Sequence, residues 1–552
     1  MLRYLVAFVI GMTLFQVAAP ARAASQVCWG VGGDKGGVDA QTGVVHVNHD
    51  VTCFTSGDTP NSGGGGNAFG GSSGGPSGGG GLQTSTNTTT TSEKKNSKAP
   101  PCLRVGDPID PASGTKVDAV TDFAMPGEMG LSFSRYYVSR NGHGQTPGGG
   151  GWSDNLDYEI YAECVYQFSN PASCTTAIFI RPDGSQIAFK QYATATTGAS
   201  LTGPFNEVGG GGLATLRYTS NGAGVPGTYA LVDEDSTVYT WTENAGAFSG
   251  NNGVLASIKN ASGIGWTLSY PSAGVTVVTH TSGQAMRLTK STVSTPNGNV
   301  AALTVTDPAG SNYAYQSKAG STVSWSQVPQ VLSSVMLPGS NPTIINYNYT
   351  VFDPNSGHPF PIGLTEVDYN GNAHDLTTYD TNGNALTTSM ADGTQKTSIK
   401  YDANATGSVV TITNALGHVS TYQYNVNAEP ISIAGQASAH CAASLARMSY
   451  DANGNMQSIA DNNGNTTNYT YSATGQLQQK VEAAGTNLAR TINYVWDTTP
   501  GTDRILSVTI VGWSKTAYTY NAQNRLASVA ITNLSSSGTP GQTLTETYQY
   551  SL

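Results

Sequence analysis

Charged residues are scarce in this sequence. Only 11% of its 552 residues are Asp, Glu, Lys or Arg, and the formal net charge is −10. Proteins that bind nucleic acids rely on a basic surface, which this composition does not provide. Nucleic acid is therefore excluded as an expected partner.

Long apolar runs are absent after the first 23 residues. Residues 1–23 begin with a short positive stretch, continue with the apolar run "YLVAFVIGMTLFQVAA" and end in Ala-Arg-Ala. This order is typical of a cleaved signal peptide, and the apolar run is short for a membrane-spanning helix. We expect a protein that is secreted or at the cell surface, with the periplasm as an alternative. No integral membrane segment is expected once the signal is removed.

Cysteine is also rare, with six residues, and no two of them form a Cys-x-x-Cys pair. The common zinc-binding spacings are therefore missing, and an even cysteine count in an exported chain favours disulfides. Six cysteines allow about 15 connectivities. Among these we favour the two local pairs, Cys28 with Cys53 and Cys164 with Cys174.

Glycine is abundant, with 67 residues, and Thr, Ser, Asn and Tyr are also frequent. This composition favours an exported β-rich protein, and the length favours about two to four domains or an extended repeat array. We predict four segments after the signal peptide: a short cysteine-containing segment at 24–60, a disordered Gly/Ser/Thr linker at 61–100, a β-rich domain at 101–252 and β-hairpin repeats at 253–552, clearest at 365–552.

The segment 101–252 reads as strands separated by turns. In "TAIFIRPDGSQIAFK" the letters "RPDGSQ" separate two apolar runs, which predicts a hairpin with Asp183 and Gly184 in its turn. We find no segment with helix caps and a 3.6-residue period. The fold class predicted from the sequence is therefore all-β.

A Tyr-Asp-x-x-Gly motif recurs in the second half of the chain. Tyr379 and Tyr401 are 22 residues apart, and Tyr450 and Tyr471 are 21 residues apart. A period in this range indicates a repeat architecture, in which each unit is one supersecondary element that needs a neighbour to bury its face.

Each repeat contains two strand-sized pieces and two turn signals. In Asp-x-x-Gly-Asn the Asp side chain can accept backbone N–H groups ahead of it, and Gly adopts positive φ at little cost. In Thr-x-Tyr-x-Tyr the period of 2 places both tyrosines on one face of a strand. The structural motif residues are Tyr379, Asp380, Gly383, Tyr401, Asp402, Tyr422, Tyr424, Tyr450, Asp451, Gly454, Tyr469, Tyr471, Gly475 and Tyr520.

These repeats resemble the YD-repeat, or RHS-repeat, family of bacterial secreted proteins. The segment "GDPIDPASGTKVDAVTDFAMPGEMGLSFSRYYVSR" also resembles the domain that commonly precedes such repeats. The resemblance implies a ribbon of stacked antiparallel β-hairpins that winds into a hollow shell, which in complete members often encloses a C-terminal toxin. It further implies a non-catalytic protein whose partners are more shell chain, a toxin or effector, or a surface glycan.

The sequence departs from the complete family pattern at its end. It stops within a repeat-like stretch, and we find neither the family's core motif nor a variable C-terminal domain there. Residues 307–310 superficially match the core's Asp-Pro-x-Gly, but repeats follow them, so we interpret them as a turn. About fourteen units of ribbon would make about one lap around a cargo of ~100 residues.

No residue pattern predicts catalysis. His46 and His49 are three apart in a predicted strand, so they face opposite ways and are unsuited to one metal site. The acidic stretch 233–236 is interpreted as a solvated turn, and no P-loop or nucleophile motif occurs. We therefore assign no catalytic residue, cofactor or metal.

Three functions remain open at this point. The favoured one is a structural shell protein in toxin delivery or cell contact, related to bacterial competition. A cell-surface module that binds glycans or proteins is the first alternative, and a secreted hydrolase with an undetected site is the second. An exposed tyrosine-lined groove would favour binding, whereas a pocket with converging carboxylates would favour hydrolysis.

Overall fold

The computed structural model describes four short strands between residues 26 and 55 and then residues 105–550 with gaps. The larger gaps are 140–150, 191–202, 208–213, 244–252, 352–361 and 437–443. The predicted signal peptide and linker lie outside the described residues. Every regular element in the described part is a strand and none is a helix, so the predicted all-β fold is confirmed.

The four N-terminal strands form two small antiparallel pairs. β1 (Gln26–Gly30) pairs with β4 (Val51–Thr55), and β2 (Gly36–Val38) pairs with β3 (Val45–Val47). Residue 46 lies in β3, and residue 49 lies outside the described residues.

A four-stranded antiparallel sheet, here called the inner sheet, follows. Its strands are β5 (Ile109–Asp110), β6 (Thr115–Ala124), β7 (Ser132–Val138) and β8 (Trp152–Asp154), paired in that order. The alternation in "SFSRYYV" places Phe133, Arg135 and Tyr137 on one face of β7, and all three are buried.

The remaining long strands form one antiparallel ribbon, in which each strand pairs with the next. Its first part is β9 (Glu159–Gln167), β10 (Asn170–Ile180), β11 (Gln186–Lys190), β12 (Gly203–Glu207), β13 (Thr215–Thr219), β14 (Thr228–Val232), β15 (Val238–Glu243), β16 (Gly253–Lys259), β17 (Gly265–Ser272), β18 (Val275–His280), β19 (Ala285–Thr295), β20 (Gly298–Thr306) and β21 (Asn312–Lys318).

The ribbon then skips the short pair β22 (Thr322–Val323) and β23 (Ser326–Gln327), because β21 pairs directly with β24. It continues with β24 (Val331–Met336), β25 (Ile344–Val351), β26 (Ile362–Tyr369), β27 (Asn372–Tyr379), β28 (Ala385–Met390), β29 (Thr397–Asn404), β30 (Gly407–Thr413), β31 (Val419–Tyr424) and β32 (Pro430–Gly435).

The last strands of the ribbon are β33 (Ser444–Tyr450), β34 (Met456–Ala460), β35 (Thr466–Tyr471), β36 (Leu477–Glu482), β37 (Arg490–Trp496), β38 (Ile505–Ile510), β39 (Ser514–Tyr520), β40 (Leu526–Asn533) and β41 (Thr543–Thr547). Among the described pairings none joins β41 back to β9, so the ribbon is open. The ladder also runs through the predicted boundary at residue 252, because β15 pairs with β16.

Two local predictions are confirmed. Asp183 and Gly184 lie in the turn between β10 and β11, where Gly184 has a φ of 81°. Residues 307–310 form the turn between β20 and β21, in which the Gly310 N–H donates to the Asp307 carbonyl at 3.0 Å.

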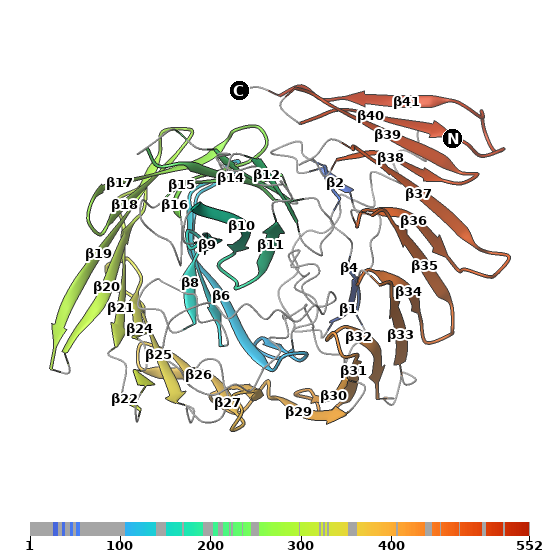
Figure 1. Ribbon diagram of the computed structural model, residues 1–552. Helices are drawn as coiled ribbons and strands as arrows, with labels where there is room; N and C mark the ends of the chain where they lie inside the picture. Colours follow the sequence, from blue (N-terminus) through green and yellow to red (C-terminus); the bar gives the residue numbers. More distant parts are fainter. Residues whose placement is uncertain are drawn as a thin grey trace.

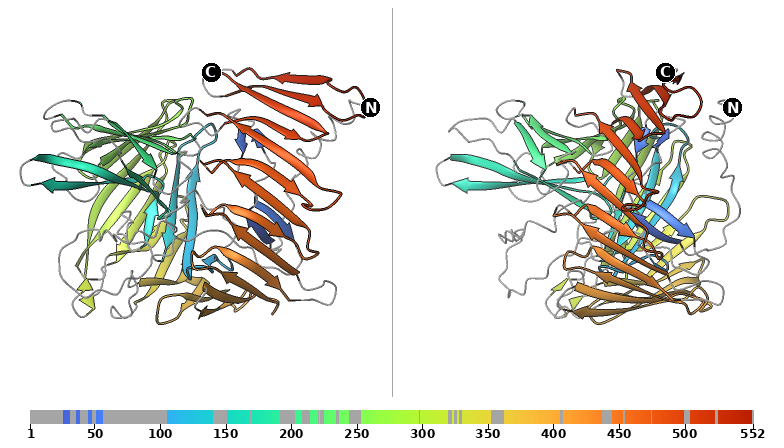
Figure 2. Two further views of the ribbon diagram at one scale, coloured as in Figure 1. Left: turned by 45° about the vertical axis from the view of Figure 1, so that its right-hand side comes forward. Right: turned by 90° about the vertical axis from the view of Figure 1, so that its right-hand side faces the viewer.

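The ribbon curves around the inner sheet, so β6 and β8 lie inside the ring of strands (Figure 1). The C-terminal strands lie side by side like rungs in both views of Figure 2. Strands far apart along the ribbon therefore reach the same inner element, which determines where side-chain contacts of long sequence separation occur.

The apolar interior of the described residues divides into three clusters. The first joins the inner sheet to strands from β9 to β26, and the second joins Val105 and Ile109 to strands from β28 to β33. The third fills the concave side of β35–β40. The second and third clusters share Met456 and Ile459 as flanking residues, whereas the first and third share none.

Candidate functional site

The Asp-x-x-Gly-Asn motif forms a defined turn at the end of each hairpin that carries it. In the turn after β27, the Asp380 carboxylate accepts the N–H groups of Asn382 and Asn384 at 2.8 Å, and the Asn384 amide donates to its other oxygen at 2.7 Å. Asp451 and Asn455 repeat this arrangement at 2.8 and 2.9 Å. The carboxylate thus satisfies backbone donors that the tight reversal leaves without ladder partners.

Glycine supplies the left-handed backbone conformation in these turns. The φ angles of Gly383, Gly454 and Gly475 are 75°, 75° and 77°. Asp402 does not form such a turn: it lies within β29, paired with Val409, and its carboxylate contacts Lys400 at 2.8 Å. The reason is local, since the first glycine after Asp402 is five residues on and the hairpin reverses there instead.

The tyrosine before each turn has a second role, because its hydroxyl reaches back to the preceding strand. Tyr379, Tyr401, Tyr450 and Tyr520 donate to the carbonyls of Leu364, Ala385, Pro430 and Ile505, at 2.7, 2.8, 2.8 and 2.8 Å. Strand register shifts beside Tyr379, Tyr450 and Tyr520, which re-aims the side chain across the neighbouring strand. The hydroxyl therefore takes a carbonyl at the strand end that the ladder does not reach.

The other motif tyrosines lie in the cores. Tyr422 and Tyr424 are on one face of β31, are 0% and 2% exposed and stack with ring centroids 6.4 Å apart. Tyr469 is 4% exposed in the third cluster, where Tyr471 packs beside it. Burial raises the pKa of Tyr471 above its usual value, with the nearby Asp451 charge adding to the rise.

A buried ion pair ties the inner sheet to the ribbon. Arg135 on β7 donates to Asp122 on β6 at 2.7 and 2.9 Å, and both side chains are 1% exposed. Asp122 lies where the register between β6 and β7 shifts, and it also accepts the Tyr315 hydroxyl at 2.7 Å. Because an unpaired charge at this depth would be costly, the pair fixes the inner sheet against the strands that surround it.

The same face of the inner sheet makes further polar contacts with the ribbon. Arg135 donates to the Tyr347 hydroxyl at 2.7 Å, and Trp152 Nε1 donates to the Tyr349 hydroxyl at 2.8 Å. Burial lowers the pKa of Arg135, but the neighbouring Tyr347 and Asp122 outweigh burial and hold this pKa above its ordinary value. Sequence reasoning missed this cluster, although Arg135 stands out as a charge on the apolar face of an alternating strand.

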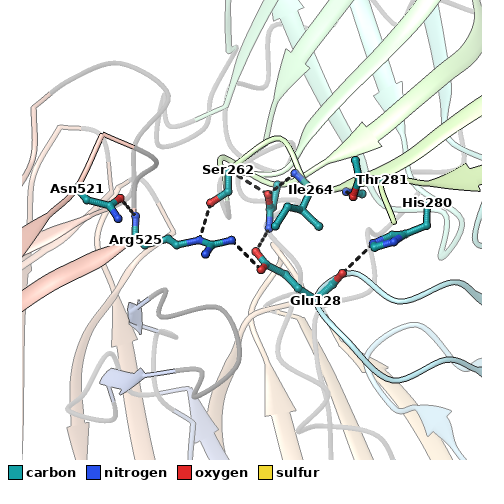
Figure 3. Close-up of polar contacts among 9 residues, drawn as sticks. Glu128, Ser262, Ile264, His280, Thr281, Asn521 and Arg525 are labelled. Carbon is teal, nitrogen blue, oxygen red and sulfur yellow. Dashed lines mark hydrogen bonds and ion pairs between the residues drawn. The ribbon is translucent and has the colours of Figure 1, made fainter. Parts of the chain in front are cut away.

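A third group of contacts joins the two ends of the ribbon through the loop between β6 and β7 (Figure 3). Glu128 in this loop accepts Arg525 Nη2 at 3.0 Å and Asn260 Nδ2 at 2.5 Å. Arg525 Nε also donates to the Ser262 hydroxyl at 3.3 Å. The turn before β40 thus meets the turn between β16 and β17, at a place that we call the seam.

The acidic turn at 233–236 differs from its prediction. The turn itself is present, since the Ser236 N–H donates to the Asp233 carbonyl at 2.9 Å. However, Asp233 is 1% exposed and bonds the Arg181 guanidinium at 2.6 Å, so the prediction of a solvated turn was wrong for this residue. Arg181 lies 52 positions earlier in the sequence, which is why local sequence did not reveal the pairing.

The predicted cysteine pairs lie opposite one another in the strand registers. Cys28 on β1 is the Cα partner of Cys53 on β4, and Cys164 on β9 is the partner of Cys174 on β10. Directly opposed strand positions are close enough for a disulfide. Both disulfides stay predictions.

The described residues contain no cluster of three or more His, Cys, Asp or Glu that could hold a metal ion. No helix long and apolar enough to span a membrane occurs among them either. What the geometry provides is turns, packing and polar ties between distant strands.

Comparison with known proteins agrees with this class of repetitive β-architecture. Residues 106–189 match a domain of unknown function (DUF6531), and residues 450–486 match the RHS repeat. The chain is therefore an RHS-repeat protein with a DUF6531 domain ahead of its repeats, as the sequence predicted. No curated protein matches it.

Two solved structures illustrate the weaker structural likenesses. A TcdB2–TccC3 crystal structure is 12% identical with a TM-score of 0.24, and covers 75% of this chain and 25% of its own. The Tc holotoxin pore of Photorhabdus luminescens is 11% identical with a TM-score of 0.25, and covers 72% and 24%. The chain thus spans about a quarter of the length of the solved chains it matches.

Proposed function

We propose that this protein is an exported, non-catalytic wall segment of an RHS-type shell that acts in toxin delivery or cell contact. The observation that carries the proposal is the winding of YD hairpins around an inner sheet (Figure 1). Each hairpin contributes turn and packing residues, and the repeated motif contains no recurring nucleophile, base or metal set. Such an element suits the enclosure or presentation of something else.

The partners that fit are more shell of the same type and a toxin or effector within it. One lap of ribbon is a band about one strand wide, and a band of that width cannot enclose a globular cargo alone. Because the chain corresponds to about a quarter of the solved chains it matches, more shell is the first partner to expect.

Deletion of the gene from the producing bacterium tests the biological role. In co-culture with a competing strain, we expect loss of contact-dependent killing or attachment, restored by the full-length gene. A gene that lacks codons 2–23 should fail to restore it while producing folded protein inside the cell. Unchanged co-culture behaviour after deletion would contradict a role in delivery or contact.

Export can be tested separately by N-terminal sequencing of the mature protein. Cleavage after Ala23 would give a protein that starts at Ala24. Recovery of the uncleaved chain in the cytoplasm of the producing bacterium would count against an exported shell.

The non-catalytic part of the proposal is tested by producing residues 24–552 inside bacteria. Growth should be unaffected, because no reaction is expected from turn and packing residues. Toxicity abolished by one polar substitution, with an unchanged circular dichroism spectrum, would demonstrate a catalytic site.

One observation favours the alternative of a surface binding module. Trp513 is 57% exposed in the turn between β38 and β39, with Val511 57% exposed in the same turn and Leu534 41% exposed beside it. Exposed aromatic rings stack on sugars and protein surfaces. Binding to a glycan array that Trp513→Ala abolishes, with shell assembly intact, would support this second function.

A further inference from the structure

The seam differs from every other boundary between neighbouring strands of the ribbon. Consecutive strands from β9 to β41 are joined by backbone ladders, such as the seven-position register between β39 and β40. At the seam, the turn of residues 521–525 meets the turn of residues 260–264 through the side chains of Arg525, Glu128, Asn260 and Ser262. The ends of the lap are therefore held by side chains, whereas the lap itself is held by backbone.

Glu128 is the common partner at this place. Its carboxylate accepts from Asn260 on one side and Arg525 on the other, and its backbone carbonyl contacts His280 Nε2 at 3.0 Å. The adjacent Met129 carbonyl accepts Trp266 Nε1 at 2.6 Å. The loop from the inner sheet is thus anchored firmly on the first repeats, and only the Glu128 carboxylate extends to the last ones.

Arg525 is positioned by its own repeat. Its backbone N–H donates to Asn521 at 2.9 Å, and its guanidinium lies 5.3 Å from the centre of the Tyr550 ring. Where other repeats carry Asn384, Asn455 or Gln476 at this place in the turn, a cation here reaches out of the turn toward Glu128.

The seam has little apolar support in the part of the chain that the structure describes. The cluster that contains Trp266 and the cluster that contains Leu526 share no residue. The side chains of Arg525 and Glu128 are 9% and 13% exposed, so water reaches the pair only partly. An ion pair in this setting is stronger than a surface pair but still weakened by salt.

From these contacts we infer that Glu128 and Arg525 form a salt-sensitive clasp that closes the first lap of the ribbon. Releasing the clasp separates the last repeats from the first ones without breaking any strand ladder. The seam is therefore the place where the wound ribbon opens toward the inner sheet. This device depends on the chain's own contacts and holds whether or not the shell carries a toxin.

Amide hydrogen exchange of the purified chain, residues 24–552, tests the clasp. Arg525→Gln and Glu128→Gln should each speed exchange in peptides that cover 260–266 and 521–527 by about tenfold, a ratio that corresponds to ~1.4 kcal/mol. The double variant should resemble either single one, because both remove the same contact. Raising NaCl from about 0.05 M to about 0.5 M should bring the native protein toward the Arg525→Gln rate.

The matched control is Arg504→Gln. Arg504 also ends a repeat turn, but it pairs with Asp497 of that same turn and connects no distant segments. Its substitution should affect exchange near 497–505 and leave 260–266 unchanged. Equal effects of Arg504→Gln and Arg525→Gln on residues 260–266, or no effect of Arg525→Gln there, would overturn the clasp.

The charge exchange Glu128→Arg with Arg525→Glu adds a second arm. It should recover part of the protection that either charge reversal alone removes, and small-angle scattering should show a smaller radius of gyration than for the single reversals. Exchange of β21, which lies in the first core cluster, distinguishes seam opening from global unfolding. A charge exchange no better than the single reversals, with β21 still protected, would also overturn the clasp.

Discussion

The guanidinium of Arg135 on β7 donates to the hydroxyl of Tyr347 on β25 at 2.7 Å, across 212 positions of sequence. The same guanidinium is held by Asp122, so one buried cation joins two strands of the inner sheet to the ribbon. The inner sheet is thereby built into the wall of the shell. Its loss should loosen strands that lie far from it in the sequence.

Arg135→Met should lower the free energy of unfolding by about 3–5 kcal/mol, because it leaves the Asp122 carboxylate buried without its charge partner. Urea denaturation followed by tryptophan fluorescence measures the change. Arg135→Met combined with Asp122→Asn should lose less, since no uncompensated charge remains.

Arg490→Met is the control for this substitution. Arg490 pairs with Glu482 on the surface, where its side chain is 54% exposed. Surface pairs contribute about 0–1 kcal/mol. A loss at Arg490 as large as the loss at Arg135 would contradict the role assigned to the buried pair.

Tyr450→Phe should lower stability by about 1–2 kcal/mol, because it removes the hydroxyl that donates to the Pro430 carbonyl and leaves that acceptor without this partner. Tyr548→Phe is the control, since the Tyr548 hydroxyl contacts Glu546 at 3.1 Å in an exposed setting where water can replace it. Thermal unfolding of the two variants should differ in midpoint. Equal midpoints would show that the repeated hydroxyl contact adds no stability.

Stability should fall in alkali. Burial raises the pKa of Tyr347 to about 12, although Arg135 opposes the rise, and burial also raises the pKa of Tyr379 and Tyr450. An unfolded tyrosine has a pKa of about 10, so the unfolded chain releases these protons first. The contribution to stability is therefore complete below about pH 10 and is lost as pH rises toward the folded pKa values.

Urea midpoints measured between about pH 9 and about pH 12 check this dependence. Absorbance at the tyrosinate wavelength should show one group of tyrosines that titrates normally and another that ionises only on unfolding. A flat stability profile over this range would contradict the burial of these hydroxyl groups.

The repeat turns could be predicted from sequence, because Asp380, Gly383 and Asn384 interact within one turn. The long-range ties could not. Asp122 meets Arg135 through a register shift, and Glu128 meets Arg525 through the curvature of the whole ribbon, over 397 positions. Asp402 shows the limit of the motif itself, since Tyr-Asp without a well-placed glycine continues as strand.

The segment 61–100 should be the first site of cleavage in limited proteolysis. Its Gly/Ser/Thr composition cannot bury enough apolar surface to offset the entropy of ordering. Mass spectrometry should find a resistant fragment that starts near residue 102. Protection of this segment in the intact chain, with cleavage elsewhere first, would contradict the predicted linker.

Cys164 and Cys174 should be joined in protein made in an oxidising compartment. They are Cα partners across β9 and β10, and the intervening loop is short, so a bridge should add on the order of 2–3 kcal/mol. Cys164→Ser should lower the urea midpoint of the oxidised protein and leave the midpoint unchanged in reductant. Peptide mapping without reduction should recover the two cysteines in one linked fragment. Free thiols at both positions would show that the paired register exists without the bridge, and the strand pair would then depend on its ladder alone.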